Sequence, residues 1–150
     1  MARDTERFKA ALRIGQVRVA EGISDLEAVS GMLRRFGAAV NEFTGGLVGV
    51  ACVTRDGHKA IEAEFVAGIP LSIVIVAHEA PERPMPIVGG LLVAEGGFPV
   101  EVIVGERTIV AHGDDGFEAG LSALAASGPF ASAVAEILSA DPSSLRQLQS

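Results

Sequence analysis

The sequence has no tryptophan, no tyrosine and a single cysteine among its 150 residues, and its only aromatic residues are seven phenylalanines. Protein interfaces and surfaces that stack nucleic-acid bases usually depend on aromatic side chains, so this scarcity weakens both interpretations. One cysteine excludes an internal disulfide. Because Cys52 lies in an apolar run, we interpret it as a buried structural thiol rather than as a nucleophile.

The sequence also lacks an apolar run long enough to cross a bilayer as a helix. The longest uncharged apolar stretch, Phe65 to Ala77, has 13 residues and contains Gly68 and Pro70. Residues 1–9 alternate in charge and lack the apolar core of a signal peptide. We therefore expect a soluble, cytoplasmic protein.

The formal net charge of −7 is unevenly distributed. Residues 1–36 hold seven Lys or Arg against five Asp or Glu, a net charge of +2, whereas residues 37–150 hold five against fourteen, a net charge of −9. An acidic body disfavours nucleic acid, because neutralised phosphates supply most of that affinity. We interpret the N-terminal basic residues as a solvated helix face, with contact to an anionic partner as the alternative.

The N-terminal quarter has helical periodicity in two parts. Residues 4–22 are predicted to form a first helix that ends at Gly22. Ser24 and Glu27 have the spacing of a capping box, which predicts the start of a second helix. An apolar a/d stripe follows, made of Leu26, Val29, Leu33, Phe36 and Val40. Residues 1–42 are therefore predicted to form an antiparallel helical hairpin.

Strand-like patterns fill the middle of the chain. The predicted strands are residues 47–54, 59–67, 71–78, 87–94, 98–104 and 107–111, with a hairpin turn at Asp56-Gly57. The runs 47–53, 71–77 and 87–94 are apolar on both faces, so the sheet must be covered on two sides. Helical patterns return over residues 116–126 and from Ser127-Gly128-Pro129 to about residue 140.

This order predicts a single α+β domain over residues 1–150. A mostly antiparallel sheet of five or six strands lies within residues 45–112. The helical hairpin (1–42) and a C-terminal helix pair (114–140) flank it, and residues 141–150 form a tail. Either the two helix pairs cover opposite faces, or they share one face and a second subunit covers the other. We favour the dimer.

The link between the third and fourth predicted strands, residues 79–86, is polar and rich in proline. It is the only long irregular stretch inside the predicted sheet, and such loops commonly carry function. We therefore predict Glu79, Glu82, Arg83 and Met85 as binding residues.

Histidines with nearby acids supply the alternatives. In a simple meander, His58 and His78 would lie at the same edge of the sheet and, with Glu79, would form a hydrolytic site with or without a metal. His112 would lie at the other edge, and with Asp114 and Asp115 it is an alternative metal site. Helix capping and dipole stabilisation explain the two aspartates without a metal.

The chain contains no nucleophile elbow, C-x-x-C, H-E-x-x-H or phosphate-loop motif. We therefore predict a non-enzymatic binding protein without a cofactor, which acts as a homo-oligomer and holds a protein partner or a small ligand, as chaperones, inhibitors and immunity proteins do. Neither nucleic acid nor a membrane is an expected partner. A small hydrolytic enzyme, with or without a metal, is the alternative.

Overall fold

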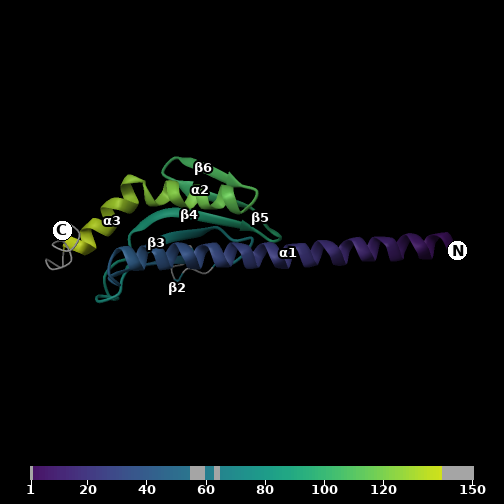
Figure 1. Cartoon of the computed structure of the whole chain (residues 1–150), viewed down its shortest axis with the longest axis horizontal. Coiled ribbons are helices and arrows are strands. Elements are labelled where there is room, and N and C mark those ends of the chain that lie inside the picture. Colours follow the sequence, from purple (N-terminus) through teal and green to yellow (C-terminus); the bar gives the residue numbers. More distant parts are fainter. Residues whose placement is uncertain (1, 55–59, 63–64, 140–150) are drawn as a thin grey trace.

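The computed structural model describes residues 2–54, 60–62 and 65–139 and shows one antiparallel sheet with a long N-terminal helix and two C-terminal helices (Figure 1). The elements are α1 (Ala2–Phe43), β1 (Val48–Thr54), β2 (Ala60–Glu62), β3 (Leu71–Ala77), β4 (Ile87–Ala94), β5 (Gly97–Val104), β6 (Arg107–Ala111), α2 (Asp114–Ala125) and α3 (Gly128–Ser139). The predicted α+β class and the C-terminal helix pair are confirmed.

The strands form from the apolar runs that predicted them. β4 and β6 have the predicted bounds, and β1, β3 and β5 differ from prediction by one residue at one end. β2 is shorter than the predicted run 59–67, because the described residues 65–67 are not in a strand. The chain instead crosses toward β4, where the Gly68 N–H donates to the Val93 carbonyl at 2.7 Å. The predicted Asp56-Gly57 turn and the tail lie outside the described residues.

The sheet has the strand order β2-β1-β3-β4-β5-β6, and every pair of neighbouring strands is antiparallel. β3 therefore pairs with β1 and not with β2, which corrects the simple meander assumed from the sequence. β1 has β2 on one side and β3 on the other, so β2 and β3 run in the same direction. This correction separates the residues that begin β2 from those that end β3.

The predicted hairpin over residues 1–42 is wrong, because α1 is one continuous helix of 42 residues. Ser24 and Glu27 lie inside it rather than at a cap. Gly22 does not end the helix, since one glycine in a helix costs only about 1 kcal/mol. A Cβ at Gly22 would lie 3.6 Å from Gly96 Cα, so this glycine lies close to the turn between β4 and β5.

Only the C-terminal half of α1 packs on the sheet. Val29, Leu33 and Val40 are buried there, which confirms the predicted a/d stripe. Residues 3–24, which we call the arm, are exposed apart from the half-buried Gly22. The arm continues the helix straight beyond the end of the sheet (Figure 1). At about 1.5 Å per residue it is roughly 33 Å long.

The other end of α1 is tied to β1 by a short turn. The Thr44 hydroxyl donates to the Val40 carbonyl at 2.9 Å and accepts the Val48 N–H at 3.1 Å, so the buried Thr44 side chain closes the end of the helix and starts the strand. Gly45 and Gly46 have φ of +64° and +87°, which glycine adopts without the steric penalty of other residues.

All three helices pack on the same face of the sheet, with α1 against β1 and β5, α2 against β5 and β6, and α3 against β3 and β4. Their apolar side chains and those of the inner sheet face form one core. Its largest fully buried members are Phe117, Ile73, Ile75, Leu91 and Leu124. Of the two arrangements predicted for the helices, the shared face is therefore the observed one.

The outer face of the sheet carries no helix among the described residues. Ala51, Val53 and Val74 are nevertheless buried there, in a small cluster against which Val76 and Met85 pack. Further along the sheet, the side chains of Ile87, Ile103 and Val110 remain exposed. A second subunit on this face stays a prediction.

Candidate functional site

The link after β3 folds back on the strand that precedes it. Two turns shape it, in which the Ala80 N–H donates to the Ala77 carbonyl at 3.1 Å and the Arg83 N–H donates to the Ala80 carbonyl at 3.0 Å. The Ile75 N–H then donates to the Pro86 carbonyl at 3.1 Å. Because three proline rings also restrict the backbone of residues 79–86, the link is held against β3 at both ends.

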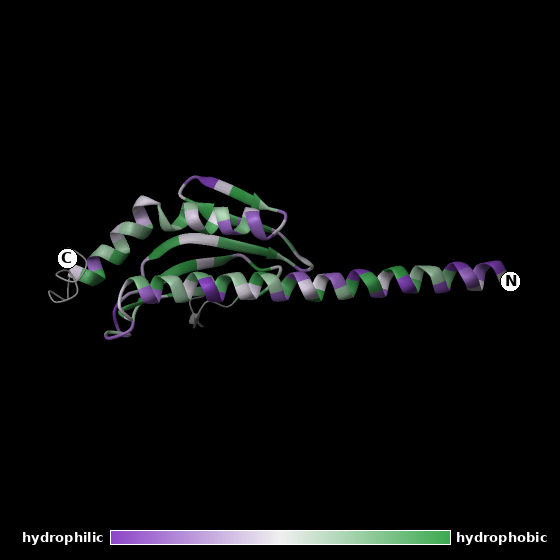
Figure 2. Ribbon diagram, viewed as in Figure 1, coloured by the Kyte–Doolittle hydropathy of each residue, from purple (hydrophilic) through white to green (hydrophobic). Residues whose placement is uncertain are grey.

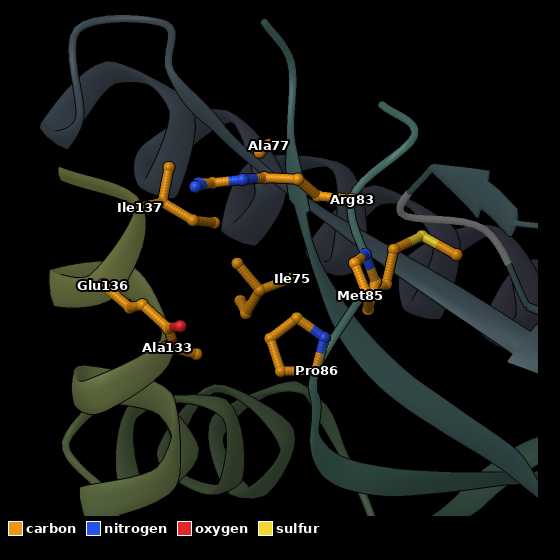
Figure 3. Close-up of a pocket in the computed structure, with 9 residues that line it drawn as sticks. Ile75, Ala77, Arg83, Met85, Pro86, Ala133, Glu136 and Ile137 are labelled. Atoms are coloured by element: carbon orange, nitrogen blue, oxygen red, sulfur yellow. The ribbon is translucent and has the colours of Figure 1, made fainter. Parts of the chain in front are cut away.

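A cavity of about 310 Å³ lies between the link, β3 and α3, and we call it the link pocket. Its lining residues are Ile75 and Ala77 of β3, Arg83, Pro84, Met85 and Pro86 of the link, and Ala133, Glu136 and Ile137 of α3. Figure 3 shows Arg83 extending from the link toward Ile137, above Ile75. The arrangement places one guanidinium group over an apolar floor.

The predicted binding residues divide into two groups. Arg83 and Met85 line the link pocket, although the Met85 side chain extends away from Arg83 and packs on the outer-face cluster (Figure 3). Glu79 and Glu82 are exposed on the same link and do not line the cavity. The loop selected from the sequence therefore borders a cavity, and the fold shows that its Arg83 side meets it. That these residues bind a ligand stays a prediction.

The predicted His58 and His78 pair cannot be examined directly, because His58 lies outside the described residues. His78 is exposed just beyond β3, and its backbone N–H donates to the Leu47 carbonyl at 3.0 Å, next to the start of β1. Ala60, the first residue of β2, pairs instead with Val53 near the end of β1. The hydrolytic site with Glu79 stays a prediction, and its premise of a shared sheet edge is not supported by the strand order.

The alternative metal site, made of His112, Asp114 and Asp115, is exposed between β6 and α2. The N-cap of α2 is Gly113, not Asp114 or Asp115, and no side chain caps the helix there. Both aspartates stand in the first turn, where carboxylates stabilise the helix dipole. Within the described ranges, no group of three or more His, Cys, Asp or Glu residues is placed to hold a metal ion.

The thiol of Cys52 is buried in β1, as predicted. Burial raises its pKa to about 12, because the low-polarity surroundings disfavour the thiolate. The neutral thiol therefore packs as a small apolar group.

A second concave surface was not predicted from the sequence. A cavity of about 590 Å³ lies between the C-terminal end of α1, α2 and α3, with a wall formed by Phe36, Ala39, Val40 and Phe43 of α1. A neighbouring cavity of about 440 Å³ continues along α1 to Met32 and shares Phe36 and Ser122 with the first. We call the two together the helix groove.

The far wall of the helix groove is made of small side chains, among them Ala125, Ala131 and Ala135. The Phe36 and Phe130 rings meet at its floor with centroids 5.8 Å apart. The a/d stripe predicted that Phe36 and Val40 face the core. It contained no sign of the gap that alanines leave between α1 and α3, because the sequence does not reveal how far apart two helices pack.

No single described helix is both long enough and apolar enough to span a membrane. The helices α2 and α3 meet that test only as a pair, with a bend of 56° between them. Figure 2 shows why α1 fails it despite its length, since hydrophilic residues recur along the whole helix.

Comparison with known proteins gives no match for this chain: no protein-family model matches it, and neither does any curated protein or solved structure.

Proposed function

We propose that this chain is a non-enzymatic binding protein that acts as a homo-oligomer and holds a protein partner or a small ligand in the link pocket. The observation that carries the proposal is the position of Arg83, whose guanidinium lies over the apolar floor made by Ile75 and Ile137 (Figure 3). A cavity with an apolar floor and one cationic side chain is typical of sites that orient a ligand by a single charged group.

The side chains that line the link pocket favour a ligand with one anionic group and an apolar body. A guanidinium group pairs with carboxylates and sulfonates through two parallel hydrogen bonds, and the apolar floor favours a hydrocarbon or aromatic body. Glu136 also lines the α3 wall, so the anionic group is expected beside the Arg83 guanidinium and away from the Glu136 carboxylate. A volume of about 310 Å³ suits one large apolar group, such as a side chain of a bound peptide or a small aromatic acid.

The link supports this role because its backbone is held in place before a ligand arrives. The hydrogen bond from Ile75 to Pro86 and the turns at Ala80 and Arg83 fix the chain on both sides of the pocket. Binding then orders little beyond the Arg83 side chain, which keeps the entropic cost of association low.

A titration with anilinonaphthalene sulfonate tests the proposal, because this dye joins an aromatic body to one anionic group. The dye is expected to bind the full-length protein with increased fluorescence. Arg83→Ala should weaken binding about tenfold, the loss of one charge-assisted hydrogen-bonding group. Ala133→Trp should abolish binding by filling the cavity.

Two control variants locate the dye. Arg107→Ala removes an exposed arginine of β6 and should leave the dissociation constant unchanged. Ala135→Trp fills the helix groove instead. A dye that responds to Ala135→Trp and ignores Arg83→Ala and Ala133→Trp would show that the link pocket is not the binding site. Native mass spectrometry of gently purified protein measures the subunit count and any retained ligand in one spectrum.

A further inference from the structure

The arm exposes more apolar surface than any other part of the described chain. It carries six of the twelve large apolar side chains that remain exposed there, and Phe8, Leu12 and Val19 have 70%, 68% and 63% of their surface in solvent. Most helical stability in proteins comes from packing of an apolar face rather than from intrinsic propensity. The structure of one chain leaves the apolar side chains of the arm without such packing.

The apolar residues of the arm follow the spacing of a packed helix. Phe8, Leu12, Gly15 and Val19 succeed one another at intervals of four, three and four residues, which is an a/d stripe. The same heptad phase continues into the residues of α1 that pack on the sheet. The stripe therefore predicts that the arm packs against a further surface.

The helix groove has the matching periodicity. Its α1 wall presents Met32, Phe36, Ala39 and Phe43, again at intervals of four, three and four residues. These residues span about 17 Å of helix, and the part of the arm from Phe8 to Val19 has the same length. Phe43 is 68% exposed at the end of the groove.

The arm cannot enter the groove of its own chain, because both belong to one straight helix and the arm points away from the sheet (Figure 1). We propose that the arm docks in the helix groove of a second copy of this chain, and that the second arm docks reciprocally in the first groove. Two antiparallel α1 helices related by a twofold axis satisfy both contacts at once. The proposal rests on the homo-oligomer of the proposed function and names its interface.

The sizes of the facing side chains favour one register of the arm against the partner's α1. With Phe8 opposite the partner's Phe43, Leu12 falls opposite the partner's Ala39 and Gly15 opposite the partner's Phe36, so a large residue meets a small one at both central positions. Alternation of this kind is how facing helices interdigitate.

Charge favours the groove over a simple pairing of two arms. The arm holds five basic and three acidic residues, a net charge of +2, so two arms side by side would repel each other. Residues 37–150 have a net charge of −9. Glu118 and Arg35 both line the groove, so their charges offset each other there, whereas Glu42 stands next to its Phe43 end. In the favoured register Lys9 falls opposite the partner's Glu42. Opposite charge therefore draws the arm to the acidic body of another copy.

Sedimentation velocity on the full-length chain tests the interface. The wild type is expected to be a dimer, and Leu12→Glu combined with Val19→Glu should raise its dissociation constant about 100-fold or more, because the two carboxylates would be buried in the groove. Both positions are exposed in the single chain, so the fold should survive, which circular dichroism verifies. Ile87→Glu, on the outer face of the sheet, is the matched control and should leave the dimer intact.

A cross-link tests the register. The double variant Leu12→Cys with Ala39→Cys should form a covalent dimer on mild oxidation, whereas Leu12→Cys alone should not, because two copies of position 12 lie far apart in the antiparallel pair. Native Cys52 is buried and does not compete.

The outcomes separate the two proposals. A dimer that dissociates with Ile87→Glu and not with the arm variant would overturn this interface and leave the homo-oligomer standing. A wild type that sediments as a monomer at every concentration would overturn both. The arm variant is expected to leave dye binding at the link pocket unchanged. The dye titration therefore tests the ligand site independently of the dimer interface.

Discussion

Replacing Gly97 with alanine should strongly destabilise the protein. Gly97 begins β5 with φ of +99°, a conformation that residues with a Cβ rarely adopt. A Cβ placed there would lie 2.6 Å from Asp25 Cβ, 2.8 Å from the Asp25 carbonyl carbon and 2.9 Å from the Leu26 nitrogen. Two of these atoms belong to the backbone of α1, so no change of rotamer relieves the contact. The substitution must move either the helix or the start of the strand.

Two effects set the magnitude. Forcing an alanine into a positive φ costs about 1–2 kcal/mol. Overpacking a well-packed contact with one methyl group costs about 1–3 kcal/mol more. We therefore expect Gly97→Ala to lower the free energy of unfolding by about 2–5 kcal/mol. In a chain of this size that corresponds to a decrease in Tm of roughly 5–15 °C.

Far-ultraviolet circular dichroism is the appropriate assay, because a chain without tryptophan or tyrosine has no useful intrinsic fluorescence. Urea titrations should be compared at one protein concentration, since the proposed dimer would make stability concentration-dependent. Gly96→Ala is the matched control. It changes the preceding glycine, where a Cβ would have nothing within 4 Å and φ is not in the left-handed range, so its effect should be within about 1 kcal/mol. Equal stability of the two variants would refute the close approach of α1 to β5.

Three further predictions test the core, the α1–β1 connection and the buried thiol. Phe117→Ala, which empties a fully buried site under α2, should lower the free energy of unfolding by about 3–5 kcal/mol in urea titrations, and a loss below 1 kcal/mol would contradict its burial. Thr44→Val should cost about 1–3 kcal/mol, because the buried N–H of Val48 loses its acceptor, with Thr108→Val on the exposed β6 as a near-neutral control. Cys52, with a pKa raised to about 12, should react with iodoacetamide at pH 8 far more slowly in the folded chain than in urea, as followed by mass spectrometry. Because the unfolded thiol ionises near 9.0 and the folded thiol does not, stability should also fall as the pH rises above 9, and a flat profile in wild type and Cys52→Ala alike would contradict this.

The strands were the elements whose bounds the sequence predicted best. Runs such as 71–77 and 87–94 are apolar, β-branched and bounded by turn residues, so their local preference and their burial agree. The predicted strand order failed, because strand pairing depends on contacts between residues far apart in the sequence. The strand partner of β3 depends on how residues 65–70 cross the sheet, and a pairing partner is not encoded in a local pattern.

The helical hairpin failed for a related reason. Gly22 and the apparent capping box at Ser24 and Glu27 are valid local signals, but each changes the free energy of the helix by only about 1 kcal/mol. Packing of Val29, Leu33 and Val40 on the sheet stabilises the second half of α1 by more than that. The helix then continues through Gly22, because each added residue of an uninterrupted helix gains a backbone hydrogen bond, whereas a hairpin would have to start a second helix anew.

The sequence by itself determined the α+β class, the strands, the C-terminal helices and the buried state of Cys52, because each follows from the local spacing of apolar side chains. From its prolines and charges it also predicted that the link is a binding loop, and that prediction stays untested. Only the tertiary structure decided that Arg83 rather than Glu79 lines a cavity, that all helices share one face, and that the arm extends beyond the sheet while the helix groove lies at the other end of α1. Those properties arise from distances between segments remote in the chain, and such distances are set by packing.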